Sequence, residues 1–287
     1  MNYSAIYRCM SFNIRNSGAE DGKNSWKYRR KMVESIVKFH HTDIVGCQEV
    51  LKDQLDDLID LLPSYGWVGV GRDDGLDAGE FAPIFYLKDR FEVLKSGTFW
   101  LSGTPDVAGS RGWDAACIRI ATWAKLKEKN TGKIHFYFNT HFDHVGQVAM
   151  EESSYLLLRK ITELAGDYPA VITGDFNNTE CSKVYNILTG KERGTHTFDN
   201  SFLKDSKYCS ENGHHGPSFT YHDFKAAKIF YELAKGKSSS QDQQMCLIDY
   251  IFVKNNIRVF QHGILSDNWD GRYPSDHMPV VADIEIL

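Results

Sequence analysis

The chain is 287 residues long, with a formal net charge of -5 at pH 7, 42% hydrophobic residues and 25% charged residues. These proportions are typical of a globular protein and exclude a disordered chain. The acidic balance argues against a protein that grips nucleic acid through a broad basic face. It does not exclude a nucleic-acid substrate, because a bound divalent cation can neutralise phosphate locally.

The six cysteines show no Cys-x-x-Cys spacing, so neither a disulfide scaffold nor a zinc site is indicated. Cys9 and Cys47 lie in apolar runs, which predicts small buried residues in a reducing compartment. No apolar stretch approaches the roughly 20 residues that span a bilayer, and the first residues lack a signal-peptide pattern. We therefore expect a cytoplasmic protein without membrane association, although a leader trimmed before this N-terminus would leave the same sequence.

The N-terminal part predicts two pairs of a strand and a helix. Residues 5–14 alternate between an apolar face and a face of small residues, as a strand does, and Asn13 falls on the small face. Apolar residues at helical spacing then predict a helix over 26–40, with Asn24 or Ser25 as its N-cap. A second strand over 43–50 precedes a second helix over 51–62.

The rest of the chain predicts more strands than helices. Strands fit residues 81–87, 118–127, 134–141, 170–172, 247–253 and 280–286, and a helix fits 153–164. Polar or glycine-rich segments at 71–80, 102–116 and 204–246 interrupt this order. The last contains the polar stretches 212–217 and 238–244, and we expect it to be a long excursion with a mobile part. No linker or repeat divides the sequence. The pattern predicts one domain over residues 1–287, of the α/β class with mixed sheets.

Polar side chains stand where several predicted strands end. The stretch from Val171 to Thr179 passes directly from an apolar run into Asp175 and Asn177. Such residues are common in turns, but strand ends are also where α/β sheets place their ligands. Asp249 is harder to assign to a turn, because it lies within an apolar strand where a carboxylate is costly unless it is paired.

Six short motifs occur in order from near the first residue to near the last: Ser11-Phe-Asn-Ile14, Gly46-Cys-Gln-Glu49, Asn139-Thr-His141, Thr173-Gly-Asp-Phe-Asn177, Ile248-Asp-Tyr-Ile251 and Ser275-Asp-His277. Together they resemble the endonuclease/exonuclease/phosphatase superfamily, the deoxyribonuclease I-like proteins. The segments 99–102 and 109–114 resemble its bacterial, nocturnin-like branch. The resemblance implies a four-layer α/β sandwich, in which two mixed sheets pack face to face with helices outside. It also implies hydrolysis of phosphate esters with a divalent cation, Mg²⁺ or Mn²⁺.

The resemblance also implies the roles of the site residues. Asn13, Glu49 and Asp276 would hold the cation, and oxygen ligands are what Mg²⁺ prefers. Asp175 would take the proton of the attacking water, with Asn177 orienting the phosphate or the water.

Two histidines would face the phosphate, each fixed by an acidic partner. These are His141 and His277, and the resemblance pairs Asp249 with His277. A shorter match pairs Glu80 with His141.

Arg111 and Arg119 could clamp a phosphate, since a guanidinium group offers paired donors to its oxygens. The alternative for Arg119 is a pairing across the sheet. The two histidines His214 and His215 fall in the expected excursion, where exposure to solvent explains them at least as well.

The leading hypothesis is therefore a cation-dependent phosphoesterase, either a phosphodiesterase such as a nuclease or a phosphatase acting on a small phosphorylated metabolite. We slightly favour a small or short substrate, because the composition shows no wide basic groove. A binding module that lost catalysis would be expected to have eroded at the acidic and histidine positions, and it has not. A lipid-directed enzyme would need exposed apolar loops. No stable protein partner is indicated.

Overall fold

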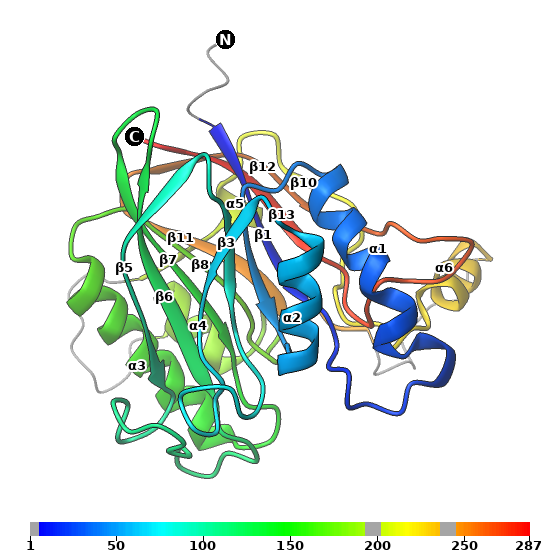
Figure 1. Cartoon of the computed structure of the whole chain (residues 1–287), viewed down its shortest axis with the longest axis horizontal. Helices are drawn as coiled ribbons and strands as arrows, with labels where there is room; N and C mark the ends of the chain where they lie inside the picture. Colours follow the sequence, from blue (N-terminus) through cyan, green and yellow to red (C-terminus); the bar gives the residue numbers. More distant parts are fainter. Residues whose placement is uncertain (1–5, 193–201, 236–244) are drawn as a thin grey trace.

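The computed structural model describes residues 6–192, 202–235 and 245–287. Two β-sheets pack face to face, and helices lie on the outer faces of both (Figure 1). The predicted four-layer α/β sandwich with two mixed sheets is thus confirmed.

The first sheet contains the two strands at the start of the chain and the strand at its end. In spatial order its members are β10 (His214–His215), β12 (Ile257–Ile264), β13 (Val280–Ile286), β1 (Ile6–Asn13), β2 (Ile44–Gln48), β4 (Ile84–Leu87) and β3 (Tyr65–Val68). β1 pairs in parallel with β2 and antiparallel with β13, so the sheet is mixed.

The second sheet is built from the middle of the chain. Its order is β5 (Phe91–Trp100), β6 (Ile120–Glu128), β7 (Ile134–His141), β8 (Ala170–Asp175), β11 (Asp249–Lys254) and β9 (Lys204–Asp205). β7 and β8 are parallel, and β8 pairs antiparallel with β11.

Helices cover the outside of both sheets, with α1 and α2 on one side of the sandwich and α3 and α4 on the other (Figure 1). Their bounds are α1 (Trp26–Phe39), α2 (Lys52–Leu61), α3 (Gln147–Ala165) and α4 (Lys183–Thr189). The remaining helices are η1 (Gly22–Asn24), α5 (Ser206–Cys209) and α6 (Ala226–Ala234). Within the three described ranges, no helix has both the length and the apolar character of a membrane span.

The alternation predicted for β1 separates two parts of the core. Met10, Phe12 and Ile14 pack beneath α1 and α2, while Cys9 on the opposite face is buried in the layer between the sheets. Cys47 is also buried, as its apolar surroundings predicted.

Several elements differ from the sequence prediction. α3 begins six residues before the predicted start, and β3, β5, β12, α4 and α6 were not predicted. The expected excursion over 204–246 contains β9, α5, β10 and α6, so much of it is regular structure. Of the two stretches on which its expected mobile part rested, 212–217 contains β10, and 238–244 lies outside the described residues. Ser25 is the N-cap of α1 without a side-chain cap bond.

Near one end of the sandwich, the layer between the sheets becomes polar. The Gln48 amide donates to Asn139 Oδ1 at 2.7 Å, and Asn139 donates in turn to the carbonyl oxygen of Cys47 at 2.7 Å. Thr173 also donates to Asn139 Oδ1, at 3.0 Å. These bonds tie the two sheets together next to the ends of the strands that carry the predicted site, which fixes the relative positions of those ends.

Candidate active site

A cavity of about 300 Å³ opens where strands of both sheets end. It is lined by Arg15, Asn16, Glu49, Arg72, Glu80, Cys117, Arg119, His141, His144, Asp175, Asn177, Tyr221, Ile248, Asp276 and His277. Strand register explains part of this gathering, because His141 on β7 and Asp249 on β11 are both aligned with Asp175 on β8.

His277 is held by Asp249, whose Oδ2 lies 2.8 Å from His277 Nδ1. Its other nitrogen, Nε2, lies 3.8 Å from Asp175 Oδ2. Burial alone would lower the pKa of His277, but the carboxylates of Asp249, Asp175 and Asp276 outweigh it and raise the pKa well above the usual value. The structure therefore holds a cationic imidazole in the cavity, with the acidic partner that the resemblance assigned to it.

Asp175 is almost fully buried at the end of β8. Burial, followed by the negative charge of Asp249, raises its pKa. The carboxylate accepts hydrogen bonds from the Asn13 amide at 2.9 Å and from the Asn177 backbone N–H at 2.9 Å. A buried carboxylate with a raised pKa and a fixed orientation is suited to accepting a proton.

His141 has the opposite electrostatic character. Burial, followed by the positive charges of Arg119 and Arg72, lowers its pKa well below the usual value. The Asn177 side-chain amide lies 3.0 Å from its Nε2. Its Nδ1 is 3.9 Å from Glu80 Oε2, which is beyond hydrogen-bond distance, and Glu80 instead accepts a hydrogen bond from Arg72. Glu80 therefore lies near His141, as expected, but does not form a hydrogen bond with it.

Two acidic residues could hold a divalent cation. Glu49 and Asp276 line the same cavity, and burial together with the charge of Glu49 raises the pKa of Asp276. Two carboxylates that repel each other in one buried space fit a hard cation, which would relieve that repulsion.

Asn13, the third expected metal ligand, contacts Glu49. It is fully buried, it is not among the residues that line the cavity, and its amide nitrogen donates to both Glu49 and Asp175. Its oxygen accepts the backbone N–H of Arg15. Asn13 thus positions Glu49 and Asp175, and its role as a metal ligand stays a prediction.

Three residues around the cavity adopt a left-handed backbone conformation that side chains other than glycine rarely accept. Arg15 and Glu49 each have φ of 58°, and Asn177 has φ of 51°. Such conformations cost free energy and concentrate at functional sites. Sequence reasoning had no signal for this, because none of the three is glycine.

The two expected phosphate-clamping arginines are separated. Arg119 is buried and lines the cavity, whereas Arg111 is exposed and is not among the lining residues. Arg111 is therefore left out of the site, because its position in an exposed loop keeps it from the cavity wall. Sequence reasoning missed Arg15, Asn16, Arg72 and Tyr221, which lie in loops outside the six motifs.

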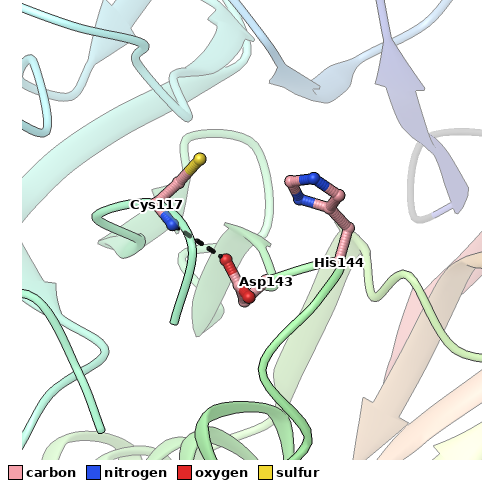
Figure 2. A group of neighbouring side chains, drawn as sticks. All are labelled: Cys117, Asp143 and His144. Atoms are coloured by element: carbon pink, nitrogen blue, oxygen red, sulfur yellow. Dashed lines mark hydrogen bonds between the residues drawn. The ribbon is translucent and has the colours of Figure 1, made fainter. Parts of the chain in front are cut away.

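A cluster of Cys117, Asp143 and His144 lies beside the cavity (Figure 2). Its ligand atoms lie within 4.8 Å of one another. The dashed bond in Figure 2 joins Asp143 to the backbone nitrogen of Cys117, and Asp143 also accepts the backbone N–H groups of Ala116, Val145 and Gly146. Three of these four donors bond to Oδ2 and one to Oδ1, so Asp143 serves to shape the loop.

A family model described as the endonuclease/exonuclease/phosphatase family matches residues 10–277. Among curated proteins, the carbon catabolite repressor protein 4 homolog 3 of Arabidopsis thaliana is 29% identical over 190 residues, which cover 64% of this chain and 40% of that protein. The chain thus spans less than half the length of that relative.

Two solved bacterial structures resemble the chain over nearly its whole length. An endonuclease/exonuclease/phosphatase from Bacteroides vulgatus is 44% identical, with a TM-score of 0.87 and coverage of 98% of this chain and 99% of that one. A mannosyl-6-phosphatase from Bacteroides thetaiotaomicron is 34% identical, with a TM-score of 0.83 and coverage of 97% and 99%.

Proposed function

The chain belongs to the endonuclease/exonuclease/phosphatase family of phosphoester hydrolases, and from that premise we propose that it removes the phosphate group from a small phosphorylated metabolite with the help of a divalent cation. The family is the one that the six motifs predicted. The match across both sheets supports one domain over residues 1–287.

The size of the cavity is the main observation in favour of a small monoester as the substrate. A volume of about 300 Å³ suits a compact polar molecule. A nuclease acting along a strand needs a groove with aromatic platforms for successive bases, and Tyr221 is the single Phe, Tyr or Trp among the lining residues given above. The similarity to a solved mannosyl-6-phosphatase over nearly the full length also supports a monoester.

Asp175 would act as the base. Water attacks phosphorus, a new P–O bond forms as the ester P–O bond breaks, and the Asp175 carboxylate takes one proton from the water. The alcohol oxygen leaves and takes up a proton from bulk water at the open side of the cavity.

The charge that develops on the phosphoryl oxygens needs donors that are already in place. The cationic His277 meets this need, because Asp249 holds its ring at 2.8 Å and keeps it protonated. The Asn177 amide is fixed between His141 and the carbonyl oxygen of Phe142, at 3.0 Å from each. These two bonds use both N–H donors of the amide, so its oxygen is left to accept a hydrogen bond from the attacking water and to orient it.

Glu49 and Asp276 would hold the divalent cation, and Asn13 would hold Glu49 in place. When bound, the cation supplies positive charge that polarises the phosphate and neutralises its negative charge. Glu49 is itself fixed by two further hydrogen bonds from Asn16, at 3.1 Å from the backbone nitrogen and 2.7 Å from the side chain.

The test compares hydrolysis of p-nitrophenyl phosphate with that of bis-p-nitrophenyl phosphate, each with Mg²⁺, with Mn²⁺ and with a chelator. We expect faster hydrolysis of the monoester, which stops when the chelator removes the cation and resumes when excess cation is restored. A clear preference for the diester would reject the phosphatase in favour of a phosphodiesterase. Activity that survives the chelator would reject the cation requirement.

A further inference from the structure

Two arginines form one wall of the cavity, and most of their donors have no acceptor. Arg119 precedes β6 and is only 5% exposed, while Arg72 comes from the loop that follows β3. Within the described ranges, the side chain of Arg119 makes one hydrogen bond, to His144 Nδ1 at 3.2 Å, and that of Arg72 makes one, to Glu80. The Nε atoms of both are buried without a partner.

The acidic neighbours do not satisfy these donors. Glu80 Oε2 is 3.7 Å from Arg119 Nη1 and Asp143 Oδ1 is 3.7 Å from Arg119 Nε, both too long for hydrogen bonds. Asp143 is already occupied by four backbone N–H groups, which lower its pKa to about 2 although burial opposes them. The terminal nitrogens of both arginines are not among the buried atoms without a partner, and both residues line the cavity, so this wall is suited to receiving acceptor atoms from a ligand at those nitrogens.

The wall lies on the far side of His141 from the proposed base. His141 Nε2 is 3.5 Å from Asp175, whereas His141 Nδ1 is 3.9 Å from Glu80, which in turn contacts Arg72. A phosphate placed for attack beside Asp175 and His277 would therefore have the His141 ring between it and the two guanidinium groups. The arginines face the remainder of the substrate.

We propose that Arg72 and Arg119 bind a second acidic group on the leaving-group side of the substrate, either a carboxylate or a second phosphate. A guanidinium group matches both through paired, charge-assisted hydrogen bonds. The proposal rests on the proposed function and narrows it to phosphorylated sugar acids or bisphosphorylated sugars.

The test compares kcat/KM for three monoesters that differ in the second group: glucose 6-phosphate, 6-phosphogluconate and glucose 1,6-bisphosphate. The wild type should prefer one or both of the acidic substrates by about tenfold or more, and which one it prefers distinguishes carboxylate from phosphate. Arg119→Gln should lower this preference by roughly ten- to a hundredfold, mainly through KM, because it removes hydrogen bonds to a charged group. Arg119→Lys keeps the charge and loses the paired donors, so its preference for acidic substrates should lie between those of the wild type and Arg119→Gln.

Arg111→Gln is the matched control, because it removes an exposed arginine outside the cavity and should keep the wild-type preference. Arg72→Gln provides a second variant at a less buried position, where folding is less at risk, and it should lower the preference in the same way. Circular dichroism and melting curves check that each variant is folded. An equal loss of kcat/KM on all three substrates, or a wild-type preference for glucose 6-phosphate, would overturn the proposal.

Hydrolysis of p-nitrophenyl phosphate separates this proposal from the proposed function. If no monoester is hydrolysed, the proposed function fails, and the acidic subsite is then tested by ligand binding alone. In that case 6-phosphogluconate or glucose 1,6-bisphosphate should raise the melting temperature of the wild type more than that of Arg119→Gln. An equal shift in both proteins, or no shift in either, would reject the acidic subsite.

Discussion

The two histidines beside Asp175 differ in charge because their neighbours differ. His277 is surrounded by carboxylates that raise its pKa, and His141 is buried next to arginines, so its pKa is lowered. When the surroundings shift the pKa values of two similar groups in opposite directions, the two groups can take distinct roles in one site. Here they leave one cationic imidazole to meet phosphate charge and one neutral imidazole in contact with the Asn177 amide.

Replacing Asp175 with asparagine tests the proposed base. Asp175→Asn keeps the shape of the side chain but removes its capacity to take a proton, so turnover of p-nitrophenyl phosphate should fall by roughly two to four orders of magnitude. A melting curve checks that the variant is folded, because the amide replaces one of the two carboxylate oxygens that accept hydrogen bonds with a donor. Unchanged turnover would show that another group takes the proton.

The left-handed conformation of Asn177 can be tested apart from its side chain. Asn177→Ala and Asn177→Gly both lose the hydrogen bonds to His141 and Phe142, and both should lose activity. Only alanine keeps a Cβ at φ of 51°, so it should be less stable than the glycine variant by about 1 kcal/mol. Urea unfolding of the two variants measures this difference. Equal stabilities would mean that the backbone is not strained there.

Sequence reasoning was most informative for residues that stand at the ends of predicted strands. It selected Asp175, Asp249 and His277, and the structure brings all three within a few ångströms of one another. It could not find Arg72 or Arg15, because their contribution depends on how loops fold back over the sheet ends, and a single arginine in a loop carries no periodic signal.

At the level of elements, the regular pattern of buried strands was predictable and the edges were not. β7 and β13 have the predicted bounds, since both alternate or run apolar over their whole length. β5 was missed because most of its first half is at least partly exposed and it contains Lys95 and Gly97. The prediction that two sheets pack against each other came from the family resemblance, because periodicity alone does not say which sheet a strand joins.

Gly46 on β2 tests how closely the two sheets must approach. A Cβ added there would lie 2.5 Å from Asn139 Oδ1 and closer still to Thr173 Oγ1. Gly46→Ala should therefore force the sheets apart and reduce the free energy of unfolding by about 1–3 kcal/mol, measured by urea unfolding. Gly103→Ala, where nothing lies within 4 Å of the added atom, should stay within about 0.5 kcal/mol of wild type. A Gly46→Ala variant as stable as this control would contradict the close approach.

On the scale of the whole molecule, the layer between the sheets contains a buried histidine away from the polar end. His135 on β7 is fully buried and stacks near Tyr7 and Phe91, with ring centroids 5.3 and 5.9 Å away. Neither ring nitrogen has a hydrogen-bond partner among the described residues. The core therefore contains an ionisable group that it can accommodate only in the neutral form.

This group should make the fold sensitive to acid. Burial lowers the pKa of His135 to about 3, whereas the unfolded chain takes up the proton near pH 6.5, so stability is lost as the pH falls below about 6.5. Replacing the ring with phenylalanine removes that proton uptake. Between pH 7 and pH 5, His135→Phe should lose about 2 kcal/mol less of its free energy of unfolding than the wild type, measured by urea unfolding at both values. Phe91→Leu perturbs the same cluster without removing an ionisable group. Between pH 7 and pH 5 it should lose as much free energy of unfolding as the wild type. If His135→Phe keeps the wild-type dependence on pH, the acid sensitivity arises from other buried histidines. These include His222 and His262, whose pKa values burial also lowers to about 3, and His141, whose pKa lies well below its usual value.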